Sequence, residues 1–255
     1  QWIVAAVFSV TQFASFSVAT VLAPLVQIFR QSVNHVFLPS MSRLQSTGDF
    51  AGMLALNSRA NCMVALLVYP LLAFAFVFAG DVIKLVYTAT YLEAVPVLRL
   101  YIVGLVAFVV ELVSTLFVLR QGAFAARANA LVLLIALPLS LYGALNWGLA
   151  GAAVGSVAAI YAERLLSLSK IAQLTGTPIP RLQDWGTLAG LLLAAALAAL
   201  AAGAALHWSE WTSFATLVAG GAIMAIAYPP ALYLTGQWRQ LTEFIDSMRN
   251  KAAHA

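Results

Sequence analysis

Between Gln1 and Gly236 the chain is almost continuously apolar. Short polar stretches divide it into segments of about 20 to 25 residues, the length that an α-helix needs to cross a bilayer. Hydrophobic residues make up 63% of the chain and charged residues 9%, with a mean hydropathy of +0.94. Charged residues make up about 25% of a typical soluble domain. The sequence therefore predicts an all-α, polytopic transmembrane helical bundle.

Apolar length and the positions of Gly, Pro and Asn predict about seven spans. They lie at residues 12–37, 57–79, 96–119, 124–145, 149–173, 186–206 and 212–235, with turns at Pro39 and 46–49, and at 80–81, 121–122, 146–148, 175–180 and 207–210. The chain starts inside an apolar run, with neither a Met nor a signal peptide. We expect it to be the C-terminal part of a longer protein.

The basic residues predict the orientation of these spans. Two of them, Lys84 and Arg99, fall on one side of the predicted membrane, and eleven fall on the other: Arg30, Arg43, Arg59, Arg120, Arg127, Arg164, Lys170, Arg181, Arg239, Arg249 and Lys251. Because Lys and Arg collect on the cytoplasmic side, we expect the C-terminal tail in the cytoplasm and residues 81–93 in a solvated outer loop. The tail is expected to form a short helix over 237–249, which would serve either as an interfacial anchor or as a regulatory segment. The basic residues form no run, so nucleic acid is not an expected partner.

No motif for soluble-enzyme chemistry is present. The chain has no phosphate-binding glycine loop, no HExxH sequence and no paired cysteines. Cys62 is the single cysteine, and His35, His207 and His254 fall in different regions. We expect no metal site, no cofactor and no enzymatic activity.

The first predicted span carries a polar stripe. At 100° per residue, one side of this helix gathers Ser17, Thr20, Gln27, Arg30, Gln31, Asn34 and His35, while the opposite side is almost wholly apolar. A spanning helix cannot present such a stripe to lipid, so it must line a wet cavity or bond to other helices. Arg30 lies nine residues before Pro39, about 13 Å along the helix. Snorkelling would explain Arg30 alone, whereas Gln27, Gln31 and Asn34 on the same face favour a cavity.

Two further predicted spans carry charge at a similar depth. Glu111 lies nine residues before Arg120, and Glu163 with Arg164 lies about ten residues from the end of the fifth span. An intramembrane carboxylate can exchange a proton or bind a cation, so Glu111 and Glu163 are ion-coupling candidates and Arg164 is a candidate cavity charge. The alternative is a structural Arg30–Glu111 or Glu163–Arg164 ion pair. Glu163 and Arg164 are adjacent, so we expect them to point in different directions and to need separate partners. Pro70 and Pro138 mark kinks, either static or used in transport.

Three stretches resemble the C-terminal half of the lipid-linked oligosaccharide flippases, the O-antigen flippase-like branch of the multidrug/oligosaccharidyl-lipid/polysaccharide exporter superfamily. They are APLVQIFRQS at 23–32 with FLPSMSRL at 37–44, FAGDVIKLVY at 78–87 with YLEA at 91–94, and NWGLAGAA at 146–153. The second departs from the family at Thr88, where a Gly is usual.

The resemblance implies the second lobe of a V-shaped transporter in the bacterial cytoplasmic membrane. Residues 1–11 would end a preceding membrane segment, 12–173 form a lobe of five spans, 174–185 a cytoplasmic linker, 186–235 two additional helices and 236–255 a cytoplasmic tail.

The implied substrate is a polyprenyl-diphosphate-linked oligosaccharide, flipped by alternating access for cell-surface polysaccharide export. Implied partners are membrane lipids, the N-terminal lobe of the same transporter and a polysaccharide polymerase or export machinery. The charge and the hydrogen-bond donors of Arg30 suit a diphosphate. The cavity around it would be lined by Gln27, Gln31, Asn34 and His35. Residues 191–200 offer a surface either for the polyprenyl tail or for ordinary lipid.

Four other functions stay open. A lipid II flippase should carry an arginine early in the first span, where Ala19 and Thr20 stand. A drug/cation antiporter would prefer an acidic pocket, and a membrane glycan polymerase or transferase would need a larger external loop. In a non-transporting assembly subunit, the polar stripe would be only a helix interface.

Overall fold

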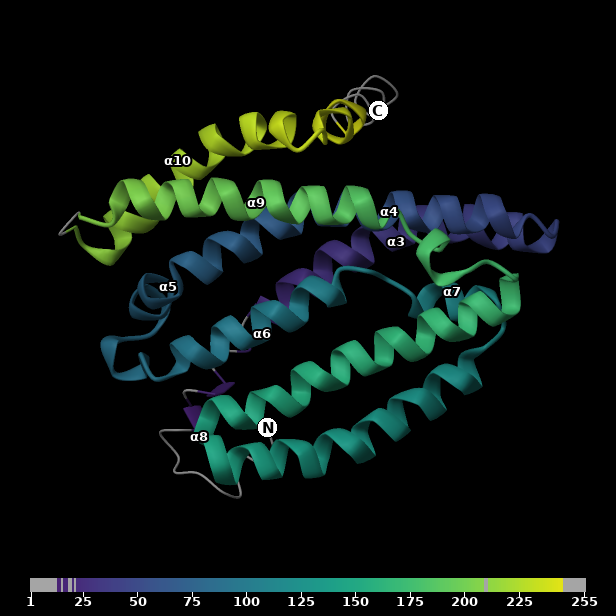
Figure 1. The fold of residues 1–255 in the computed structure, drawn as a ribbon, viewed down its shortest axis with the longest axis horizontal. Coiled ribbons are helices and arrows are strands. Elements are labelled where there is room, and N and C mark those ends of the chain that lie inside the picture. The colour runs from purple at the N-terminus through teal and green to yellow at the C-terminus, as the bar shows by residue number, and fades with distance from the viewer. Residues whose placement is uncertain (1–12, 15, 18–19, 21, 209–210, 245–255) are drawn as a thin grey trace.

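The computed structural model describes residues 13–14, 16–17, 20, 22–208 and 211–244 (Figure 1). Within these ranges the chain is helical and has no strand. The helices are α3 (Leu22–Ser46), α4 (Phe50–Val77), α5 (Ala79–Val86), α6 (Ala94–Phe108), α7 (Val113–Val118), α8 (Gly122–Thr175), α9 (Trp185–Leu206) and α10 (Ser213–Leu234), with short 3-10 helices η1 (Ala89–Tyr91) and η2 (Ile179–Arg181). Residues 238–244 of the tail are also helical.

Five helical segments of the described chain are long and apolar enough to span a membrane, namely α4, Ala94–Val118, α8, α9 and α10. α8 has 54 residues, about twice the length that one crossing needs. It folds back at Gly148, where φ is 64° and ψ is −147°, and Figure 1 shows its two legs side by side. Counting the two legs of α8 separately and adding α3 gives seven helical segments, here called arms. Seven is also the number of spans that the sequence predicts. The protein is a polytopic helical membrane bundle, as predicted.

The turns between the arms lie at two opposite ends of the molecule. Figure 1 shows the α3–α4 turn, the α7–α8 turn and the segment after α8 at one end, and the α5–α6 turn, the fold in α8 and the α9–α10 turn at the other. This alternation agrees with the sides to which the sequence assigned the turns. α4 lies centrally, since it packs against α3, α6 and α9.

Three predictions about the ends of spans and loops are wrong. The first span was expected to end at residue 37, before Pro39, but α3 runs through this proline to Ser46, because an interior proline removes one hydrogen bond without forbidding the helix. The second span was expected to begin at residue 57, but α4 begins at Phe50. Asp81 and Lys84 were expected in a solvated loop, but they lie in α5, which buries Ala79 and Ile83. The Asp81 carboxylate accepts a hydrogen bond from the Ser213 hydroxyl of α10 at 2.9 Å. Residues 1–12, 15, 18–19 and 21, which include part of the first predicted span, residues 209–210 of the predicted turn before the last span, and the tail beyond 244 lie outside the described residues.

The hairpin of α8 depends on two glycines that face each other across its legs. A Cβ atom added to Gly143 would collide with the backbone carbonyl of Gly151, and one added to Gly151 would collide with the carbonyl of Gly143. Small residues are what allow membrane helices to approach this closely. The hairpin therefore tolerates no side chain at either position without moving the legs apart.

We expect Gly151→Ala to lower the melting temperature of the purified protein, because overpacking of this kind costs about 1–3 kcal/mol. The measurement is a fluorescence-monitored thermal melt in detergent. Gly221→Ala is the matched control, since nothing lies within 4 Å of a Cβ at this position of α10. Equal melting temperatures for the two variants would contradict a close contact between the legs.

Candidate functional site

The third predicted span is broken in its middle. α6 ends at Phe108 and α7 begins at Val113, so residues 109–112 are not helical. Glu111 lies in this break and is only 3% exposed. Non-helical backbone is tolerated at membrane depth only where other protein groups or water satisfy its N–H and C=O groups. The sequence did not predict the break.

Two asparagines of α4 hold the broken backbone. The Asn61 side-chain oxygen accepts a hydrogen bond from the Glu111 N–H at 2.9 Å. The Asn57 amide donates to the Glu111 carbonyl at 3.1 Å and to the Thr115 hydroxyl at 2.9 Å. The Asn61 amide donates to Asn57 at 3.1 Å and to the side-chain oxygen of Gln183, between α8 and α9, at 3.0 Å. These amides thus replace hydrogen bonds that an unbroken helix would have made within itself.

Arg30 of α3 forms an ion pair with the carboxylate in the break. Its Nη2 lies 2.7 Å from Glu111 Oε2, and the two side chains are only 8% and 4% exposed. Arg30 Nη1 donates to the Phe108 carbonyl, which ends α6, at 2.9 Å. The second oxygen of Glu111 accepts from the Ser114 N–H at 2.9 Å. The pair therefore links α3 to both ends of the break.

A second ion pair lies close to the first, on the second leg of α8. Arg164 Nε is 3.3 Å from Glu163 Oε2, and Glu163 also accepts a hydrogen bond from the Ser167 hydroxyl at 2.8 Å. The expectation that these neighbours need separate partners is wrong, because the long arginine side chain folds back onto the adjacent carboxylate. The Phe108 ring joins the two pairs, since its centroid is 3.9 Å from Arg30 Cζ and 5.1 Å from Arg164 Cζ.

The polar stripe of α3 is divided in the structure. Asn34 reaches the break, where its amide is 3.4 Å from the Ser114 hydroxyl. Gln27 is partly buried, and its side-chain oxygen has no hydrogen-bond partner among the described residues. Gln31 and His35 are exposed on α3. The structure therefore brings together Arg30, Glu111, Glu163 and Arg164, with Asn34 beside the break, but it does not bring Gln31 and His35 into this cluster.

Asn57, Asn61 and Gln183 are the site residues that the sequence reasoning missed. Two asparagines four residues apart in an apolar helix fall on one face, and buried amides need partners. This spacing was the available signal. Nothing in the sequence indicated that their partner would be the backbone of Glu111.

Comparison with known proteins finds a family match in the N-terminal part of the chain. The first 96 residues match the family model described as polysaccharide biosynthesis protein. This match bears out the resemblance and supports a role in polysaccharide biosynthesis or export. The part matching the polysaccharide biosynthesis family includes Arg30 and both asparagines of α4, whereas Glu111 and the second ion pair lie beyond it. No curated protein and no solved structure matches.

We expect Asn61→Ala to destabilise the break, because a buried backbone N–H left without a partner costs about 1–3 kcal/mol. The expected result is a lower melting temperature and faster hydrogen–deuterium exchange at residues 109–112. Asn146→Ala is the matched control, since the hydrogen bond of the exposed Asn146 in the described part of the chain stays within its own helix, at the Tyr142 carbonyl. Unchanged exchange at residues 109–112 would mean that Asn61 does not hold the break.

Proposed function

We propose that this chain is part of a flippase that moves a polyprenyl-diphosphate-linked oligosaccharide across the bacterial cytoplasmic membrane by alternating access. The observation that carries the proposal is the buried Arg30–Glu111 ion pair at a broken membrane helix. The family match to polysaccharide biosynthesis supports the class of substrate. The substrate leaves chemically unchanged, so the protein is not an enzyme and needs no cofactor.

The chemistry of the cluster suits a diphosphate. A doubly charged headgroup cannot cross hydrocarbon without compensating charge and hydrogen bonds. Arginine offers a permanent charge and a fork of donors that matches phosphate oxygens. Arg30 and Arg164 both contact the Phe108 ring, and Arg30 Nε and Arg164 Nη1 have no hydrogen-bond partner among the described residues. These two guanidinium groups therefore keep donors available to a further anion.

The charge state of Glu111 would decide whether Arg30 can bind the diphosphate. In the present conformation its carboxylate occupies Arg30. Protonation of Glu111 would remove the internal anion and leave Arg30 free to bind the diphosphate. Proton binding at Glu111 and substrate binding at Arg30 would therefore favour each other. Glu163 holds the same relation to Arg164. A broken helix suits such a role, because half-helices around a central site can move separately.

The lipid tail of the substrate needs an apolar path beside this site. A groove of about 220 Å³ lies where α4, α6 and α9 meet. Its lining from α9 consists of Leu192, Ala196, Ala199 and Leu200, which belong to the stretch 191–200 that the sequence offered for a polyprenyl chain. The groove supports a substrate whose tail stays in the membrane while its headgroup crosses.

Further features of the proposal follow from the basic residues and from the resemblance. We place the C-terminal tail in the cytoplasm, because the end of the molecule from which it emerges carries most of the arginines. The N-terminal lobe of the same transporter would complete the cavity, with Gln31 and His35 facing it. A polysaccharide polymerase or export machinery would receive the flipped glycan.

The test measures on which membrane face the lipid-linked glycan accumulates, using the full-length protein in its own host. We expect the cytoplasmic face both in the deletion strain and in a strain expressing Arg30→Ala at normal abundance, with outer-face glycan reduced about tenfold or more, as the loss of one charge-assisted contact predicts. Arg127→Gln, an exposed arginine of α8, should leave glycan display unchanged. Normal display in a deletion strain without a redundant flippase would refute the flippase and favour drug export or an assembly role.

A double variant separates a functional ion pair from a structural one. Replacing both charges, as in Arg30→Met with Glu111→Leu, removes the cost of an unpaired buried charge, so the double variant should recover abundance that either single variant loses. We expect recovered abundance without recovered glycan display. Recovery of both would mean that the pair only holds the helices together.

A further inference from the structure

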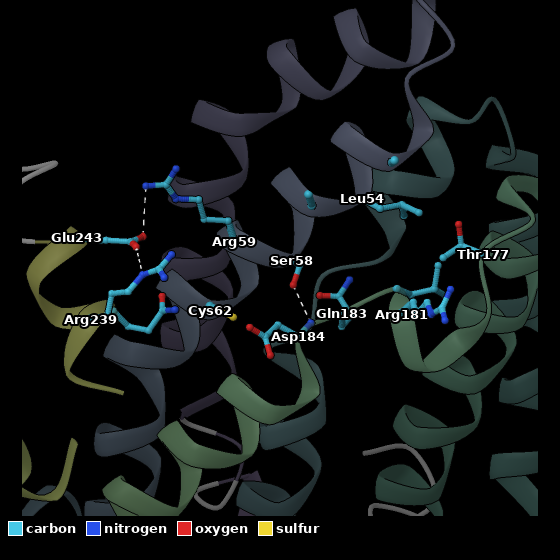
Figure 2. Close-up of a pocket in the computed structure, with 14 residues that line it drawn as sticks. Leu54, Ser58, Arg59, Cys62, Thr177, Arg181, Gln183, Asp184, Arg239 and Glu243 are labelled. Carbon is cyan, nitrogen blue, oxygen red and sulfur yellow. Dashed lines mark hydrogen bonds and ion pairs between the residues drawn. The ribbon is translucent and has the colours of Figure 1, made fainter. Parts of the chain in front are cut away.

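A second polar site lies at the end of the bundle where α4 and α9 begin. Here a cavity of about 590 Å³ lies between the start of α4, the segment 177–184 that leads into α9, and the tail segment after Gly236. Figure 2 shows Arg59 and Arg239 on one flank of the cavity and Arg181 on the other. Ser58, Gln183 and Asp184 lie between the two flanks. The site is separate from the Arg30–Glu111 pair and does not depend on the proposed transport.

The cavity already holds an anionic group of the protein itself. Glu243 of the tail lies 2.7 Å from Arg239 Nε and 3.5 Å from Arg59 Nη2 (Figure 2). The hydrogen bond from Arg239 lowers the pKa of Glu243, with a smaller contribution from the charge of Arg59. Glu243 is therefore a carboxylate at neutral pH, held between two arginines from different parts of the chain.

The remaining charges favour a further anion. The other carboxylate of the cavity, Asp184, is committed to capping α9, because its two oxygens accept hydrogen bonds from the Thr187 N–H at 3.0 Å and the Thr187 hydroxyl at 2.7 Å. Arg181 forms no ion pair within the described part of the chain. Arg59 and Arg239 thus share one carboxylate, that of Glu243, and Arg181 lies on the opposite flank (Figure 2).

We propose that this cavity binds a phosphate group, with Arg59 and Arg239 as its ligands and Glu243 as the internal anion that the phosphate displaces, while Arg181 adds positive charge from the opposite flank. A phosphate offers several acceptor oxygens in place of the two of a carboxylate, and arginine binds it with paired hydrogen bonds. Thr177 and Gln240, which also line the cavity, supply neutral donors. The phosphate belongs either to an anionic lipid headgroup in the adjacent leaflet or to a soluble phosphorylated compound, because the cavity lies at the end of the spans.

The experiment uses the full-length protein in nanodiscs and has one arm for each source. In phosphatidylcholine nanodiscs, calorimetric titration with inorganic pyrophosphate tests a soluble ligand. In nanodiscs of equal parts phosphatidylcholine and phosphatidic acid, native mass spectrometry of retained lipid tests a headgroup. Binding in the first arm identifies a soluble phosphate, and selective retention of phosphatidic acid with no pyrophosphate binding identifies a lipid.

Charge variants then decide whether the cavity is responsible. Arg59→Gln should weaken binding about tenfold, the effect of one lost charge-assisted hydrogen bond. Glu243→Gln should strengthen binding severalfold, because it removes the competing carboxylate, and a change that only damaged the fold would not have this sign. Arg127→Gln should leave binding unchanged. The proposal is overturned if neither ligand binds, if Glu243→Gln weakens binding, or if Arg127→Gln weakens it as much as Arg59→Gln does.

Discussion

A backbone that leaves its helix inside a membrane must find hydrogen bonds elsewhere, and this constraint organises the centre of the molecule. Residues 109–112 meet it with the side-chain amides of Asn57 and Asn61, which replace helical hydrogen bonds at Glu111. Because both asparagines are on α4 and the break follows α6, the two helices must keep one register relative to each other. The position of the Glu111 carboxylate, and therefore of its partner Arg30, depends on this register.

Charge in the bundle is arranged in pairs around one aromatic ring. Arg30 with Glu111 and Arg164 with Glu163 each cancel their net charge, which makes their burial tolerable in a medium that solvates ions poorly. The Phe108 ring faces both guanidinium groups and adds a cation–π contact to each. In the proposed transport, neutralising one of the two carboxylates would leave its arginine free for an anion.

α4 also connects the two polar sites of the protein. Gln183 lines the cavity at the end of the bundle and accepts a hydrogen bond from Asn61, which in turn accepts one from the Glu111 N–H. Ser58, next to Asn57, accepts a hydrogen bond from the Asp184 N–H at 2.8 Å. Two hydrogen bonds therefore lead from the lining of the cavity at the end of the bundle to the broken helix. One face of α4 holds the segment before α9 and the break together.

The sequence by itself determined the membrane bundle, the number of its arms and the ends at which they turn, because apolar length, breakers and charge asymmetry are local properties. It also singled out Arg30 and Glu111, since a charge within an apolar span is conspicuous in any context. Only the tertiary structure decided that these residues pair, that Glu163 and Arg164 meet, and that the third span is broken. These outcomes depend on which side chains other helices bring within hydrogen-bonding distance. Helical periodicity assigns a residue to a face of its own helix, but it does not specify what packs against that face.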